Sequence, residues 1–285
     1  MIESTLELPA LRERIRQLLL ESGWDAPDID RVLETELPGM VRRRVSLSSK
    51  PTGAAPAFRL GGLPRLPADV AWPIHSSCCG LTLSYIGALD CAALPRDHLA
   101  APLPDSGQVL FFYASDAEAE DCNIVRDPDA FAVLYVPDTV EAAERTPPES
   151  EYQPEIAERV DLYAIPSLEL GLDYFYCQLP DEECQRLNDA IEGMWNESKQ
   201  CLDGVGGYPS AQQYPPEWAM ARDEHERTGG DMEELEARAR QEWMVLLHVF
   251  ESPTENGEYL NYMIRLDDLA AGRFDRVVLS VDIHD

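Results

Sequence analysis

Apolar positions near the N-terminus follow the spacing of an amphipathic helix. Over residues 9–22, leucine and isoleucine recur every three or four positions with arginine and glutamate between them, which predicts a helix. A second helix is predicted from Pro27 to about Glu36, where Pro38-Gly39 would end it. We expect this helical pair to form a separate unit, residues 1–40. It should pack against the β body through four apolar side chains: Leu18, Leu19, Val32 and Leu33.

From residue 41 onward, short apolar and aromatic runs lie between turns rich in glycine and proline, as is typical of β-strands. The predicted strands are Arg42–Leu47, Leu83–Leu89, Gln108–Tyr113, Phe131–Val136, Asp161–Ile165, Met244–Phe250, Glu258–Ile264 and Arg276–Val281. Two stretches have helical spacing instead, 181–199 and 232–241. The expected fold class is therefore α+β, with a mainly antiparallel β body over residues 41–285.

The order of these strands occurs twice along the chain. A Gly-Gly-x-Pro segment, Gly61–Pro64, precedes three strands in the first half, and a second one, Gly206–Pro209, precedes three strands in the second half. In each half a glycine stands directly before the second of these strands. The pattern predicts an internal duplication with two pseudo-repeats, about 41–158 and about 159–285.

Both Gly-Gly-x-Pro segments are predicted to be tight turns. Adjacent glycines permit positive φ, and the residue before a proline disfavours helix. A phosphate-binding loop would lead into a helix N-terminus, usually with a lysine, whereas here a proline follows almost at once and no lysine is near. The residues expected to have this structural role are Gly61, Gly62, Pro64, Gly206, Gly207 and Pro209.

The chain is strongly acidic. It carries 53 Asp and Glu against 23 Lys and Arg, which gives a formal net charge of −30. Such a surface repels nucleic-acid phosphates and anionic membranes, and it attracts basic proteins or cations. We therefore expect no nucleic-acid or membrane partner. The expected partner is an unidentified protein, peptide or small molecule, and the oligomeric state is left open.

Hydropathy and cysteine content indicate a cellular compartment. No apolar run approaches the roughly 18 residues that a membrane span needs, and the N-terminus lacks the basic segment of a signal peptide. The seven cysteines are spread over 285 residues, unlike the even counts in short chains that form secreted disulfide frameworks. Reduced thiols and a cytoplasmic location are expected.

Reactive side chains are present without a recognised catalytic pattern. His75, Cys78 and Cys79 lie close together, yet they lack the two spaced cysteine pairs of a structural zinc site. No metal and no cofactor are therefore predicted. A cysteine nucleophile needs a nearby histidine, and nothing in the sequence places His98 or His248 beside a cysteine. Phosphate-loop, dinucleotide-binding and serine-hydrolase signatures are absent, so a non-enzymatic role is favoured.

Glycine, proline and aromatic motifs carry a family resemblance. In the first half they are Leu60–Pro64, Trp72-Pro73 and Ser106-Gly107. In the second half they are Gly206–Pro209, Gln212-Gln213, Gly257–Leu260 and Leu266–Leu269. Together they resemble the YwqG-like family, a bacterial family whose function has not been assigned. The resemblance covers about residues 41–283. It implies an α+β, mainly antiparallel fold, and it implies no agreed catalytic residues.

Three functional hypotheses follow. The first is a binding or interaction module with a cleft between the two pseudo-repeats, because clefts between related halves commonly hold ligands. The aromatic residues expected to line that cleft are Trp72, Tyr113, Tyr208 and Tyr214. The second is an acidic immunity- or inhibitor-like protein that binds a basic partner by charge. The third is an unrecognised hydrolase or transferase that uses cysteine or carboxylate side chains.

Overall fold

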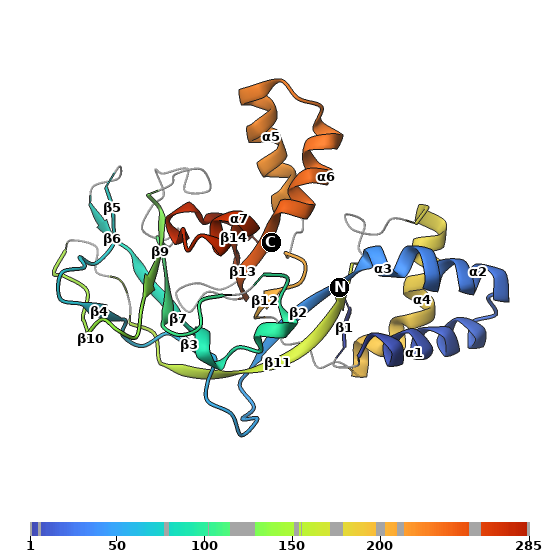
Figure 1. Cartoon of the computed structure of the whole chain (residues 1–285), viewed down its shortest axis with the longest axis horizontal. Coiled ribbons are helices and arrows are strands. Elements are labelled where there is room, and N and C mark those ends of the chain that lie inside the picture. Colours follow the sequence, from blue (N-terminus) through green and yellow to red (C-terminus); the bar gives the residue numbers. More distant parts are fainter. Residues whose placement is uncertain are drawn as a thin grey trace.

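A computed structural model of the chain places one large sheet in the middle, a helical unit on one side and a helical hairpin that projects from the sheet (Figure 1). The structure describes residues 2–4, 7–76, 80–101, 103–114, 129–150, 154, 156–171, 179–197, 203–209, 214–250 and 258–283.

The large sheet has eleven strands in the order β15-β14-β13-β12-β2-β11-β3-β7-β8-β9, with β1 paired to β11. Every neighbouring pair is antiparallel. Together with the helices this confirms the predicted α+β, mainly antiparallel class. The strands are β1 (Ile2–Ser4), β2 (Val41–Ser48), β3 (Phe58–Leu60), β7 (Ser84–Asp90), β8 (Gln108–Tyr113), β9 (Phe131–Val136), β11 (Val160–Leu170), β12 (Gly204–Gly206), β13 (Trp243–Phe250), β14 (Glu258–Arg265) and β15 (Val278–Ile283).

The strand order is the same on both sides of the central β2·β11 pair. Outward from this pair, one side continues β12-β13-β14-β15 and the other continues β3-β7-β8-β9. A β-bulge interrupts the register of the first hairpin on each side, near Gly87 and near Leu247. The internal duplication stays a prediction. The two halves share a continuous sheet at β2·β11, where eight residue pairs are in register.

The main core lies between the two halves of the sheet, which face each other. The ring of Phe111 on β8 lies 4.9 Å from the ring of Tyr262 on β14, and both side chains are fully buried. Tyr135 on β9 stacks on Phe274 at 5.3 Å. Aromatic and branched residues on facing strands therefore fill one core, as in a sandwich of two sheets.

Short strand pairs at the periphery are β4 (Arg65–Pro67) with β10 (Ala142–Glu144) and β5 (Ile74–His75) with β6 (Leu81–Thr82).

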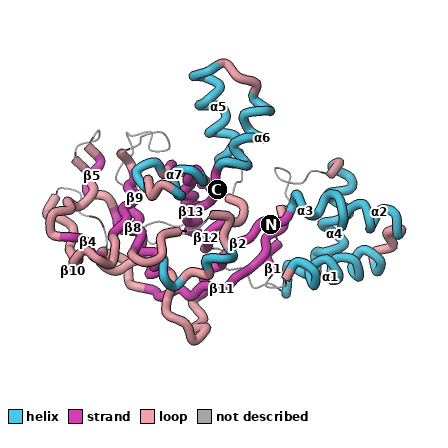
Figure 2. The backbone as a smooth tube through the Cα atoms, in the orientation of Figure 1, coloured by secondary structure: helices cyan, strands magenta, loops and turns pink. Residues whose placement is uncertain are grey.

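The N-terminal helices form a second core with a helix from the second half of the chain. They are α1 (Leu8–Glu21), α2 (Ala26–Arg31), a π-helical segment (Val32–Glu36) and α3 (Leu37–Met40), and they pack with α4 (Asp181–Glu197) (Figure 2). Leu11, Ile15 and Leu187 are buried there. The expected contact with the β body is present, because Leu168 and Leu170 of β11 and Val41 of β2 join this core. The contact with α4, which supplies much of the apolar surface, was not predicted.

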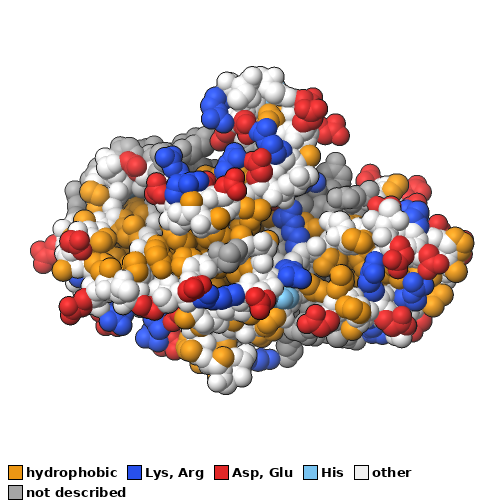
Figure 3. All heavy atoms as spheres, viewed as in Figure 1, with side chains coloured by type: hydrophobic (Ala, Val, Ile, Leu, Met, Phe, Trp, Pro, Cys, Tyr) orange, Lys and Arg blue, Asp and Glu red, His pale blue; other side chains and the backbone are white. Residues whose placement is uncertain are grey.

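A helical hairpin is inserted between β12 and β13. It consists of α5 (Pro216–Thr228) and α6 (Met232–Glu242). Gly229 ends α5 with φ of 71°, and the Asp231 carboxylate caps α6 by accepting a hydrogen bond from the Glu234 amide, as expected for C′ and N-cap positions. Figure 3 shows acidic and basic side chains mixed over this hairpin. Elsewhere in the described residues, the helices are α7 (Leu266–Ala270) and the short 3-10 turns Cys91–Ala93, Arg96–His98 and Phe274–Arg276.

Several predicted boundaries differ from the structure. The second N-terminal helix does not end before Pro38, because Pro38 lies in the first turn of α3, where a missing amide hydrogen costs no intrahelical bond. The strand predicted as Asp161–Ile165 extends to Leu170. The hairpin is helical in both arms, whereas only 232–241 was predicted to be helical.

One cysteine prediction is wrong. Cys184, in the first turn of α4, is disulfide-bonded, so reduced thiols do not describe this position. A cysteine count could not show this, because pairing depends on which segments the fold brings together. Cys78 and Cys79 lie outside the described residues. Across the described part of the chain, no helix combines the length and apolar character needed to cross a bilayer.

Candidate functional site

A cavity of about 540 Å³ lies between the start of β2 and helix α6. We call it the Tyr208 cavity. The residues that matter for its chemistry are Gly39, Arg42, Tyr208, Glu233, Glu236 and Arg240. They come from the junction of α3 with β2, the second Gly-Gly-x-Pro turn and one face of α6, so three separate segments of the chain build the walls.

The second Gly-Gly-x-Pro turn positions Tyr208. Gly206 and Gly207 have φ of 73° and 76°, a conformation that glycine adopts without strain. A Cβ atom on Gly207 would lie 2.1 Å from Glu169 Oε2, so a larger residue cannot fit. The Gly207 amide donates to the Arg43 carbonyl at 2.9 Å, and the Tyr208 amide donates to Glu169 Oε2 at 2.7 Å. The turn is thereby fixed to both central strands.

A buried ion pair supports this turn. Arg44 on β2 and Glu169 on β11 form a salt bridge of 2.9 Å, with side chains 4% and 3% exposed. Taking two charges out of water is costly, and good geometry with further hydrogen bonds offsets that cost. Here the second Glu169 oxygen accepts from Tyr208. The pair therefore couples the centre of the sheet to the wall of the cavity.

Arg42 holds the Tyr208 ring from the other side. Its guanidinium carbon lies 4.2 Å from the ring centroid, within the range of a cation–π contact. The same group donates to the Arg240 carbonyl at 3.1 Å and lies 3.6 Å from the carboxylate of Glu217, which is fully buried. Arg42 and Arg44 alternate along β2 and so share one face of the strand. Tyr208 is therefore held rigidly before any ligand binds.

Helix α6 supplies the charged wall of the cavity. Glu236 pairs with Arg240 one turn along the helix at 2.5 Å. Glu233 is exposed, and within the described residues it takes part in no ion pair. At the lining, Arg42 and Arg240 face the carboxylates of Glu233 and Glu236, and behind the wall Arg42 already lies 3.6 Å from the buried carboxylate of Glu217. Cavity and charge together favour a ligand with a positive group.

A row of buried polar residues continues from this site across the sheet. Ser46, Gly204, His248 and Asn261 are neighbours on four adjacent strands. His248 Nδ1 lies 3.0 Å from Asn261 Oδ1. Burial, and secondarily the charge of Arg44, lower the pKa of His248 to about 3, because both disfavour the imidazolium. The imidazole is therefore neutral at physiological pH.

The four predicted cleft aromatics lie in three different environments. Trp72 is 8% exposed and donates from Nε1 to the Leu83 carbonyl at 2.8 Å, and Tyr113 is 1% exposed in the main core. Tyr208 lines the cavity. Tyr214 is 61% exposed and stacks on Trp218 at 4.5 Å. The structure does not bring them together, and a ligand-binding role for any of them stays a prediction.

The first Gly-Gly-x-Pro turn has the same backbone form as the second. Gly61 and Gly62 have φ of 68° and 76°. A Cβ atom on Gly61 would lie 2.6 Å from the Glu158 carbonyl oxygen, and one on Gly206 would lie 2.9 Å from the Arg43 carbonyl oxygen. Both turns therefore let two backbones approach closely. Pro64 and Pro209 follow, and Pro64 is buried.

The predicted cysteine and histidine candidates form no reactive cluster within the described residues. His75 is buried, Cys91 is the free cysteine of this part of the chain, and burial raises the pKa of its thiol to about 12. His98 Nε2 lies 2.6 Å from the Ser167 carbonyl oxygen. Over the same residues no group of three or more His, Cys, Asp or Glu side chains could hold a metal ion.

These features define an α+β protein with one large antiparallel sheet and a polar cavity beside its central strands. A family described as "Domain of unknown function (DUF1963)" matches residues 58–282, and the chain belongs to that family. The match covers both Gly-Gly-x-Pro turns and helix α6 but not β2. The resemblance to the YwqG-like family stays a prediction. No curated protein matches this sequence.

Sequence reasoning missed most of the cavity residues. Of the residues that carry the site, only Tyr208 was singled out. One signal was available, because Arg42 and Arg44 stand two positions apart in a predicted strand and so share one of its faces. Charges on the buried face of a strand need partners, but 125 residues separate Arg44 from Glu169. Only the fold identifies that partner.

Proposed function

We propose that the chain is a binding module that holds a cationic segment of a partner polypeptide in the Tyr208 cavity. The observation that carries this proposal is the Tyr208 wall, fixed by Glu169 and Arg42, facing an α6 surface on which Glu233 forms no ion pair with any described residue. A volume of about 540 Å³ lies within the usual range for ligand pockets. A lysine or arginine side chain could enter it and pair with Glu233.

Overall charge supports the same class of ligand. A net charge of −30 attracts cationic partners over long range and raises association rates. Long-range attraction alone does not select a site, whereas the cavity offers a defined place for one positive group. The acidic inhibitor-like alternative differs on this point, since it needs only the charged surface.

The test uses the full chain and a fluorescein-labelled tetralysine peptide at a salt concentration of about 0.15 M. Fluorescence anisotropy gives the affinity for three proteins: the unchanged chain, Glu233→Lys and the control Glu21→Lys. Glu21 is exposed at the end of α1, outside the cavity, and both variants change the net charge equally. Neither replaces a buried group.

We expect Glu233→Lys to weaken binding by about tenfold, because a fixed positive charge then faces the ligand, and Glu21→Lys by about twofold or less. Equal weakening by both variants would overturn the cavity proposal and favour recognition by the acidic surface as a whole. No measurable peptide binding would exclude both.

A further inference from the structure

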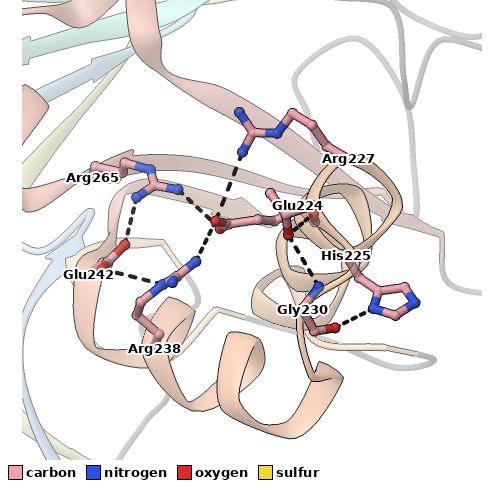
Figure 4. Close-up of polar contacts among 8 residues, drawn as sticks. Glu224, His225, Arg227, Gly230, Arg238, Glu242 and Arg265 are labelled. Carbon is pink, nitrogen blue, oxygen red and sulfur yellow. Dashed lines mark hydrogen bonds and ion pairs between the residues drawn. The ribbon is translucent and has the colours of Figure 1, made fainter.

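A second cavity, of about 370 Å³, lies on the other side of the helical hairpin, against the sheet. We call it the Trp243 cavity. Its apolar lining includes Met220, Trp243 and Val278. Three arginines from three separate elements surround it: Arg227 on α5, Arg238 on α6 and Arg265 at the end of β14. Figure 4 shows these arginines directed toward one another around Glu224.

Two carboxylates link the three arginines. Glu224 lies 2.5 Å from Arg238, 3.8 Å from Arg265 and 4.0 Å from Arg227. Glu242 lies 2.6 Å from Arg265 and 3.5 Å from Arg238. Three guanidinium groups therefore lie close together in a chain with more than twice as many acids as bases.

The arginines have more donors than the two carboxylates can use. Three guanidinium groups carry about fifteen N–H donors, whereas the two carboxylates that contact them offer about eight acceptor sites. A third lining carboxylate, Asp223, pairs instead with Arg222 at 3.6 Å. The Arg227 side chain is 73% exposed and only reaches Glu224 at 4.0 Å. Donors therefore remain for an incoming anion. The guanidinium forks already bind carboxylates here, a geometry that suits a further carboxylate.

The floor of the cavity adds an apolar requirement. Arg265 lies 4.9 Å from the centre of a ring of Trp243, and Val278 is 39% exposed beside it. A ligand that binds only through charge would leave this surface in contact with water, whereas an attached apolar chain would cover it. The arginine side chains favour an anionic group and the apolar floor favours an apolar chain, so the cavity suits an amphipathic ligand.

We propose that the Trp243 cavity binds an organic carboxylate attached to an apolar chain. The carboxylate sits against Arg227 beside Glu224, and the chain lies on Trp243. This site is separate from the Tyr208 cavity and requires a ligand of the opposite charge. Its test is therefore independent of the proposed function.

The experiment titrates octanoate into the full chain by calorimetry, with octanol and octylamine as probes that share the apolar chain. The Trp243 indole NMR signal, assigned with a Trp243→Phe variant, reports where binding occurs. Arg227→Gln tests the anion contact. Arg276→Gln is the matched control, because Arg276 is 67% exposed, pairs only with its neighbour Asp275 among the described residues, and lies outside the cavity.

We expect octanoate to bind at least about tenfold more tightly than octanol and to shift the Trp243 signal. Arg227→Gln should weaken octanoate binding by about fivefold and Arg276→Gln should leave it unchanged. The proposal is overturned if octanol or octylamine binds as tightly as octanoate, if both arginine variants weaken binding equally, or if octanoate does not bind.

Discussion

The two cavities share helix α6 and differ in how their charges are held. Glu233, Glu236 and Arg240 on one face of α6 line the Tyr208 cavity. Arg238 and Glu242 on another face line the Trp243 cavity. One helix thus separates a site where the exposed Glu233 carboxylate makes no ion pair among the described residues from a site where guanidinium donors outnumber the carboxylate acceptors that contact them.

The two cavities differ more in how deeply their charged side chains are buried than in the charge of the ligand that each favours. The Tyr208 cavity is supported by charges in the interior, the Arg44–Glu169 pair and the carboxylate of Glu217. The ion pairs around Trp243 lie at the surface, with side chains up to 73% exposed. Buried pairs are costly to break, whereas exposed pairs contribute little to stability. Substitution of the buried charged residues that support Tyr208 should therefore lower the stability of the fold. Substitution of the exposed charged residues around Trp243 should mainly change ligand binding.

The largest effect is expected from Glu169→Gln. It removes the carboxylate that pairs with the buried Arg44 charge, which should lower the free energy of unfolding by about 3–5 kcal/mol. The matched change Glu242→Gln, in the Trp243 cavity, should alter it by less than about 1 kcal/mol. Urea denaturation of both variants measures the difference, and similar losses would show that the two sets of charges are not held differently.

Valine substitutions at two glycines distinguish the effect of a steric clash from the effect of backbone strain. Gly207 and Gly272 both have positive φ, of 76° and 67°, but a Cβ atom would meet Glu169 Oε2 at 2.1 Å only at Gly207 and nothing within 4 Å at Gly272. Strain alone should cost each valine variant about 1–3 kcal/mol. Gly207→Val should lose about 1–3 kcal/mol more, because the turn must also move away from Glu169. The melting temperatures of the two valine variants measure this difference. An equal decrease in both would contradict the predicted clash between a side chain at position 207 and Glu169.

The pH dependence of protein stability should show that the imidazole of His248, near the Tyr208 cavity, is shielded from water. The folded state keeps His248 neutral down to a pKa of about 3, whereas the unfolded imidazole gains a proton near pH 6.5. Stability that is present above pH 6.5 is therefore lost as pH falls toward 3. The stability gap between the unchanged chain and His248→Gln should narrow by about 1.4 kcal/mol per pH unit in this range. Parallel pH profiles would mean that His248 is hydrated.

The smallest effect is expected at the exposed pairs. Arg238→Gln removes the hydrogen bond that lowers the pKa of Glu224, and it should reduce stability only slightly, because exposed ion pairs contribute little. The difference should be greatest at low salt and should disappear near 1 M, where charges are screened beyond about 3 Å. It should also diminish as acid protonates Glu224. If the stability loss of Arg238→Gln persists at high salt, the Arg238–Glu224 pair behaves like a buried ion pair.

Local sequence pattern predicted the elements more reliably than their contacts. Strand periodicity located the runs at β8 and β14 to within about a residue, and the paired glycines marked turns that need positive φ. Periodicity does not say which core a helix joins, so the contact of α1 with α4 was missed. Aromatic residues such as Trp72 fit a core as well as a ligand surface, and only burial separates the two.

The most direct test of the account uses two alanine methyl groups on α6. Ala237 lines the Tyr208 cavity, and Ala239 lines the Trp243 cavity. In methyl-labelled full-length protein, the tetralysine peptide should shift the Ala237 signal and leave Ala239 unchanged, and octanoate should do the reverse. If either ligand shifts both signals equally, or the peptide leaves Ala237 unchanged, the helix does not separate two sites of opposite charge preference.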